Sequence, residues 1–189
     1  MVWSKMKQNL ESFLCPALVG RVEYRATSYR YAPDKSGRCY ITVDKKEVFR
    51  MSDISTLVRW FQTEQEIKND PNLIIPVSQE EIEAVRKDMG GSIPEERLAV
   101  IARNRKISDY AKEIMAAQAI LSKSDFYYSA NKFLSDSIED SLESKDILLN
   151  IFALIDRRVG KKRLLSMSEK IRLKHSIVQY FYDLRCSTM

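Results

Sequence analysis

The segment from Asp146 to Arg158 constrains the fold more than any other part of the chain. Its large apolar residues leave almost no room for a polar face: Ile147, Leu148, Leu149, Ile151, Phe152, Leu154 and Ile155. A helix that is apolar all round has to be covered on several sides, because a surface helix needs a polar stripe. We therefore expect a buried helix at the centre of the C-terminal half, with Gly160 as its C′ residue.

The residues directly after this helix are the most basic in the chain. The cations concerned are Arg157, Arg158, Lys161, Lys162 and Arg163, followed by Arg172 and Lys174 on the last expected helix. Such a cluster can neutralise several phosphates, which would make polyanion binding strongly salt-dependent. Cations also suit the C-terminal end of a helix and a soluble surface. Both interpretations remain open at this point.

The net charge of +5 is too small to indicate nucleic-acid binding by itself, but its distribution is uneven. Residues 1–75 carry a net +3, residues 76–155 a net −4 and residues 156–189 a net +6. An acidic middle followed by a basic end can be recognised by a polyanion or by an acidic protein partner.

The first third of the chain predicts the order helix, three strands, helix. The helices are expected at 1–18, with Ser4 as N-cap, and from Ser52 or Asp53 to Lys68; the strands are expected at 20–31, 38–44 and 47–51. Apolar and charged residues alternate in the strands, and short turns, including one at 32–37, join them, which predicts an antiparallel meander. The residues expected on the buried stripe of the second helix are Ile54, Leu57, Val58 and Phe61.

The rest of the chain predicts helices only. They are expected from Ser78 to Gly90, from Ser92 to Ile107, from Ser108 to Leu121, at 124–135, at the apolar segment described above, and from Ser166 or Ser168 to Leu184. The fold class is therefore α+β, an α-β-β-β-α unit followed by a helical region of about five helices. Because Asn69 to Asn72 breaks the second helix, we expect units at 1–70 and 78–189 with a linker at 71–77.

The meander offers a second candidate surface, in which arginines and tyrosines are interleaved. They are Arg21, Arg25, Arg30 and Arg38 with Tyr29, Tyr31 and Tyr40. Arginine and tyrosine together can pair with phosphates and stack on bases, so this composition suits nucleic acid. The same residue types serve as cross-strand pairs and as anchors in protein interfaces. The pattern thus indicates an interface without naming the partner.

Enzymatic chemistry has little support, and we assign no catalytic residue, metal ligand or cofactor. His175 is the only histidine, and the three cysteines (Cys15, Cys39 and Cys186) lack metal-site spacing. Carboxylates cluster at 80–83, at 95–96 and at 139–143, which is typical of solvated helix faces. No signal peptide or run of about 20 apolar residues is found, so a cytoplasmic protein is expected.

Two resemblances add to this reading. The element order of residues 4–68 is similar to that of the double-stranded-RNA-binding domain, although Ser52-Asp53-Ile54-Ser55 stands where that family has lysines. The chain also resembles a small uncharacterised family of bacterial cytosolic proteins. The resemblance to the opening of that family lies in Trp3-Ser4-Lys5 and Gly20-Arg21-Val22, and the resemblance to its ending lies in Asp156 to Lys161 and Phe181-Tyr182-x-Leu184-Arg185. The second resemblance implies a bacterial, cytosolic protein and no particular activity.

Taken together, the sequence favours a non-catalytic binding protein that takes up nucleic acid or another polyanion through the basic C-terminal cluster and the Arg/Tyr sheet face. One alternative is a protein-interaction protein, such as an immunity protein, an antitoxin or a regulatory subunit with an acidic partner. The other is an enzyme that uses a carboxylate cluster. The sequence does not indicate an oligomeric state.

Overall fold

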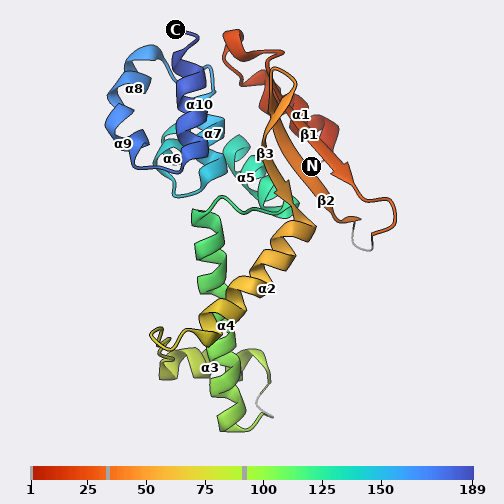
Figure 1. Cartoon of the computed structure of the whole chain (residues 1–189), viewed down its shortest axis with the longest axis vertical. Coiled ribbons are helices and arrows are strands. Elements are labelled where there is room, and N and C mark those ends of the chain that lie inside the picture. Colours follow the sequence, from red (N-terminus) through yellow and green to blue (C-terminus); the bar gives the residue numbers. More distant parts are fainter. Residues whose placement is uncertain (1, 33–34, 91–92) are drawn as a thin grey trace. The chain divides into compact units, whose positions relative to one another are not determined.

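The chain has an α+β fold, as expected from its sequence (Figure 1). The computed structural model describes residues 2–32, 35–90 and 93–189. In chain order the elements are α1 (Trp3–Ser12), the 3₁₀ turn η1 (Pro16–Leu18), β1 (Val22–Ser28), β2 (Gly37–Val43), β3 (Lys46–Ser52), α2 (Asp53–Asn69), α3 (Gln79–Asp88), α4 (Glu95–Ala117), α5 (Lys123–Ser135), α6 (Ile138–Glu143), α7 (Ile147–Leu154), α8 (Lys161–Ser166), α9 (Ser168–Arg172) and α10 (Ser176–Cys186). Parts of the turn expected at 32–37 and of the helix break expected around 90–92 lie outside the described residues.

Contacts divide the chain into two compact units. The first contains Met1–Thr56 and Ala116–Met189, and the second contains Leu57–Met115. The chain passes from one unit to the other within α2 and again within α4. The segment 71–77, expected as a linker, belongs to the second unit.

The sheet of the first unit is the expected antiparallel meander, in the order β1-β2-β3. Tyr24 pairs with Ile41, and Ile41 pairs with Phe49, so these core-facing residues form one row across the sheet. Val48 is an extra residue in β3, because the register shifts between Ile41 and Thr42. The turn between β2 and β3 has positive φ at Asp44 and Lys45 (48° and 66°), as a tight hairpin requires.

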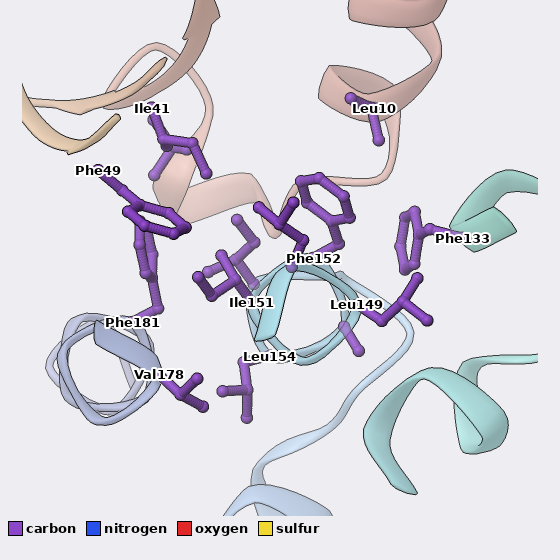
Figure 2. Packing of buried hydrophobic residues seen from close by; sticks show 14 of the residues in the cluster. Leu10, Ile41, Phe49, Phe133, Leu149, Ile151, Phe152, Leu154, Val178 and Phe181 are labelled. Carbon is purple, nitrogen blue, oxygen red and sulfur yellow. The ribbon is translucent and has the colours of Figure 1, made fainter. Parts of the chain in front are cut away.

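The α7 helix is the centre of the first unit, and all eight of its residues are buried. Figure 2 shows α7 along its axis, with side chains from α1, β2, β3, α5 and α10 around it. The rings of Tyr24, Phe126 and Phe133 lie 5.8, 5.6 and 5.4 Å from the ring of Phe152. The carboxylate of Asp146 caps the helix by accepting hydrogen bonds from two backbone N–H groups. The expected central helix is thus confirmed, although it ends sooner, at Leu154.

Several boundaries differ from expectation, for local reasons. Val2, and not Ser4, is the N-cap of α1. Gly160 is the N-cap of α8 and not the C′ residue of α7, because the chain turns at 155–159 before the next helix begins. The expected last helix is divided into α9 and α10, and the short helix α8, which was not expected, precedes them; the side chain of His175 caps α10 by accepting a hydrogen bond from the N–H of Ile177. Ser108 lies within the single helix α4 and begins no new helix.

The second unit is built from the greater part of α2, from α3 and from most of α4. The capping box expected at Ser78 and Glu81 is present at the start of α3. Two small apolar clusters hold the unit together: Ile67, Ile107 and Ala111 in one, and Val85, Leu98 and Ala102 in the other. Within the described residues, no helix is both long and apolar enough to cross a bilayer.

The stripe predicted to be buried on α2 is exposed, and the sequence-based orientation of this helix is wrong. Its four members, Ile54, Leu57, Val58 and Phe61, are each more than half exposed. The helix instead buries Thr63 and Ile67 and packs Trp60 against the α4 residues of its cluster. The α2 helix has two partly apolar faces, and the periodicity of the sequence alone does not tell which of them is buried.

Candidate functional site

Alternate residues of the three strands point away from the core and form an open face on the sheet. The register places Arg25, Tyr40 and Arg50 side by side in one row, with Tyr40 on the central strand. We call this surface the open sheet face and define it by Glu23, Arg25, Arg38, Tyr40, Glu47 and Arg50. Their neighbours in sequence, including Tyr24, Cys39 and Met51, are buried on the opposite side. Period-two geometry therefore places three arginines and one tyrosine on the same face of the sheet.

The ring and the guanidinium groups are held by contacts within the face. The guanidinium carbon of Arg38 lies 5.3 Å from the centroid of the Tyr40 ring, which is a cation–π arrangement. Arg25 donates to Glu23 over 2.7 Å, and Arg50 donates to Glu47. The hydrogen bond from Arg25 lowers the pKa of Glu23, and the bond to Glu47 raises the pKa of Arg50.

These ion pairs lie at the surface, and this decides what they can do. The side chains of Arg25 and Arg50 are about half exposed, at 49% and 55%. Exposed pairs contribute little net stability, since water competes for both partners. Breaking either ion pair would therefore cost the fold little stability.

The other sheet residues predicted from sequence are spread along the strands. Arg21 lies at the opposite end, where Asp44 accepts two hydrogen bonds from its guanidinium over 2.9 and 2.8 Å. Tyr29 follows β1, and its charge interaction contributes to the raised pKa of Arg50. Arg30 lies over the ring of Tyr31, which is 90% exposed. None of these four belongs to the open sheet face, whereas the predicted Arg25, Arg38 and Tyr40 do.

Arg50 was missed by the sequence reasoning, which stopped at the first two strands. Its signal was present, because Arg50 stands between the buried residues Phe49 and Met51. A charged residue between two buried ones in a strand has to point outward.

The C-terminal cluster is divided between structural and free cations. Arg158 is structural: its guanidinium and its backbone N–H donate to the buried carboxylate of Asp156 over 2.7–3.1 Å. The same guanidinium lies 4.3 Å from the centroid of the Phe13 ring and 5.6 Å from that of Phe133. These contacts hold the Arg158 side chain against the protein.

Three of the remaining six cations have a neighbouring acid or an amide oxygen as partner. Arg163 lies 3.6 Å from Glu139, and Arg172 lies 3.0 Å from Glu169. Lys174 donates to Asn150 Oδ1 over 2.6 Å, and its partial burial lowers its pKa. In the acidic segment at 139–143, Glu139 is thus the partner of Arg163, and Glu143 is the partner of Lys170.

Three of the predicted C-terminal cations make no side-chain ion pair or hydrogen bond in the described part of the chain: Arg157, Lys161 and Lys162. The two lysines lie in the first turn of α8. There they do not complement a helix C-terminus, so the helix dipole does not account for them.

A cleft of about 560 Å³ lies between β3 and α10. The polar residues among those that line it are Arg50, Gln118, His175, Ser176 and Tyr180, and none of the lining residues is acidic. The carboxylate clusters noted in the sequence lie elsewhere. No three His, Cys, Asp or Glu side chains come together as metal ligands in the portion of the chain that is described.

The fold and the surfaces define a small α+β protein in which a meander is packed on an apolar central helix. The chain belongs to the SF0329 protein family, whose model matches residues 2–186. No curated protein and no solved structure matches the chain.

Proposed function

We propose that this protein is a non-catalytic binding protein whose open sheet face takes up single-stranded nucleic acid. The observation that carries the proposal is the row Arg25–Tyr40–Arg50 across the three strands, with Arg38 against the tyrosine ring. An aromatic ring on the central strand offers a stacking platform for a base. Guanidinium groups on both sides can contact the phosphates that precede and follow that base.

Binding proceeds by exchange of contacts. A base replaces Arg38 on the Tyr40 ring, and phosphates replace Glu23 and Glu47 as partners of Arg25 and Arg50. Because three arginines each neutralise about one phosphate, the logarithm of affinity should fall with the logarithm of salt concentration with a slope of about −2. The contacts address the backbone and the face of a base, so we expect little sequence preference.

The test is fluorescence anisotropy with a labelled mixed-sequence single strand of DNA or RNA at several salt concentrations. Tyr40→Ala should weaken binding about 5- to 100-fold, the range for loss of one stacked base. Arg38→Ala should weaken binding and reduce the salt slope by about 0.7. Matched controls are Tyr128→Ala and Arg103→Ala, which remove an exposed tyrosine and an exposed arginine elsewhere, and both should bind like the wild type.

A triple variant separates this site from the C-terminal cluster. It combines Arg157→Ala, Lys161→Ala and Lys162→Ala, and so removes the cations of that cluster that make no side-chain ion pair or hydrogen bond among the described residues. We expect only a modest loss of affinity, through long-range attraction. If this variant abolishes binding while Tyr40→Ala has no effect, the site is on α8 and the proposal is wrong. If the wild type fails to bind at low salt, nucleic acid is not the ligand.

A second candidate function, binding of a partner protein, is favoured by the exposed apolar stripe on α2. Four neighbouring large apolar side chains on one helix face are typical of a protein interface. This alternative includes an immunity protein, an antitoxin or a regulatory subunit. Failure of nucleic-acid binding together with a contact through α2 would support it.

A further inference from the structure

The cleft between β3 and α10 lies wholly within the first unit, and its lining combines apolar walls with polar groups. Its volume of about 560 Å³ falls within the range of about 300–1,000 Å³ in which proteins hold small organic ligands. The apolar lining residues are Val48, Phe49, Ala119 and Ile177, and the polar ones are Arg50, Gln118, His175, Ser176 and Tyr180. Apolar walls with a small number of polar groups are typical of a ligand site.

The walls of the cleft are anchored in the core of the first unit. Phe49 on β3 and Phe181 on α10 both belong to the buried cluster around α7 (Figure 2). At the end of β3, the backbone N–H of Ser52 donates to the carbonyl oxygen of Leu121 over 3.0 Å, which ties the strand to the segment that carries Gln118. The cleft is therefore formed without a ligand, and binding does not have to order its walls.

His175 supplies the cleft with a hydrogen-bond donor of fixed identity. Its Nδ1 accepts a hydrogen bond from the backbone N–H of Ile177 over 3.1 Å. Because an accepting nitrogen carries no proton, the proton of the imidazole is on Nε2. Nε2 makes no hydrogen bond within the described part of the chain, so it can donate to a ligand in the cleft.

The other polar lining residues also have donors to spare. The side chains of Gln118, Ser176 and Tyr180 make no hydrogen bond to any other described residue. Arg50 donates to Glu47 from Nε, and its Nη1 and Nη2 have no acceptor among the residues described. All five polar lining residues can therefore donate, and no carboxylate lines the cleft to accept from them. This arrangement favours an anionic ligand.

The number of donors indicates which kind of anion fits. A carboxylate has two oxygens, whereas the phosphate group of a monoester has three strong acceptor oxygens and a charge close to −2 at neutral pH. Five donor side chains are better satisfied by the phosphate group, and the planar fork of an arginine matches its geometry. The apolar walls would remain uncovered by an inorganic ion, so the ligand also needs an apolar body.

We propose that the cleft between β3 and α10 binds a phosphate monoester with an apolar body. The phosphate group accepts hydrogen bonds from His175 Nε2 and the Gln118 amide, and the body lies against Val48 and Ile177. The site is independent of nucleic-acid binding on the open sheet face. Arg50 borders both surfaces, and for this reason the test leaves it unchanged.

The test is a nuclear magnetic resonance titration of the full ¹⁵N-labelled chain with 1-naphthyl phosphate. Three comparison compounds each change one feature: 1-naphthol has no phosphate, 1-naphthoate has a carboxylate instead, and inorganic phosphate has no apolar body. We expect 1-naphthyl phosphate to shift the amides of Gln118, His175, Ser176 and Ile177, with a dissociation constant below about 1 mM. Each comparison compound should bind at least about 10-fold more weakly.

Two variants remove single donors from the cleft. Gln118→Ala removes the amide, and His175→Asn removes Nε2 while it keeps a residue type that caps helices well, so α10 should still begin at Ser176. Each variant should weaken binding of 1-naphthyl phosphate about 10-fold, the effect of one lost hydrogen bond to a charged group. Gln8→Ala, at an exposed position of α1, is the matched control and should bind like the wild type. Circular dichroism should show the same helix content in all three variants.

The outcomes are distinct. Shifts around the cleft that both variants weaken and the control does not weaken support the proposal. Absence of binding at about 10 mM overturns it, as does equal binding of any comparison compound or an unchanged affinity in either variant. Shifts centred on Tyr40 place the ligand on the open sheet face and also overturn it. Tyr40→Ala should leave this binding unchanged, and Gln118→Ala should leave single-strand binding unchanged, so the two proposals can fail separately.

Discussion

Replacing Arg158 by alanine should destabilise the protein strongly, although the residue belongs to the basic cluster that sequence alone assigns to ligand binding. Asp156, its partner, is 1% exposed and receives two hydrogen bonds from the Arg158 Nε, at 3.1 Å, and one from Nη2, at 2.7 Å. Arg158 also covers the rings of Phe13 and Phe133. The substitution removes all these contacts and leaves a buried carboxylate without its counter-charge.

The magnitude follows from these contacts. Removal of one partner of a buried pair costs about 3–5 kcal/mol. We reduce this to about 2–3 kcal/mol, because the Arg158 side chain is 38% exposed and its backbone N–H still serves Asp156. Loss of the two ring contacts adds about 1 kcal/mol. We therefore expect a loss of about 3–4 kcal/mol in the free energy of unfolding.

Urea unfolding followed by circular dichroism measures this loss. Arg157→Ala is the matched control: its exposed side chain has no acidic partner within the described residues, so the variant should differ from the wild type by less than about 0.5 kcal/mol. In the double variant Arg158→Ala/Asp156→Ala the loss should be smaller than the sum of the single losses, since no buried charge remains. A loss below about 1 kcal/mol for Arg158→Ala would refute the structural role.

Three further predictions concern the first unit. Phe152→Ala should lower the free energy of unfolding by about 3–5 kcal/mol, because the ring is buried among three other aromatic rings. Thermal unfolding measures this loss. Tyr128→Ala, at an exposed position, is the control and should leave the free energy of unfolding unchanged. Gly37→Ala should lower the free energy of unfolding by about 2–3 kcal/mol, because a Cβ there would lie 2.0 Å from the carbonyl oxygen of Thr27. Gly160→Ala is the control and should be tolerated, because a Cβ at Gly160 would meet open space. Equal urea midpoints for the two variants would contradict this prediction. Burial raises the pKa of Cys39 from 9.0 to about 12, so the unfolded chain loses this proton first and stability should fall as pH rises from about 9 toward 12. Cys39→Ala should show a shallower fall in urea midpoint between about pH 8.5 and 9.5, and an identical slope would contradict the assignment.

The parts of the fold that sequence predicts are those that local patterns determine. Alternation along β1, β2 and β3 with short turns is sufficient for an antiparallel meander, because neighbouring strands have no other way to pair. The burial of α7 follows from the absence of a polar face. In both cases the pattern allows a single arrangement.

The parts that sequence misses depend on residues distant in the chain. Nothing near Arg163 in the sequence indicates that Glu139 lies 3.6 Å away, so a cation that looks free has an acidic partner. The orientation of α2 is missed because Trp60 and Ile67 offer a second apolar face, and packing with α4 selects it. The row of arginines around Tyr40 needs the register of three strands, which alternation within each strand does not supply.

The most direct test of the proposed function is a nuclear magnetic resonance titration of the ¹⁵N-labelled protein with a mixed-sequence single strand. We predict that the largest amide shifts occur at Arg25, Arg38, Tyr40 and Arg50, with the tyrosine ring protons moving upfield as a base stacks on them. Shifts confined to residues 157–163, or no shifts at low salt, would contradict the assignment of the open sheet face as the binding site.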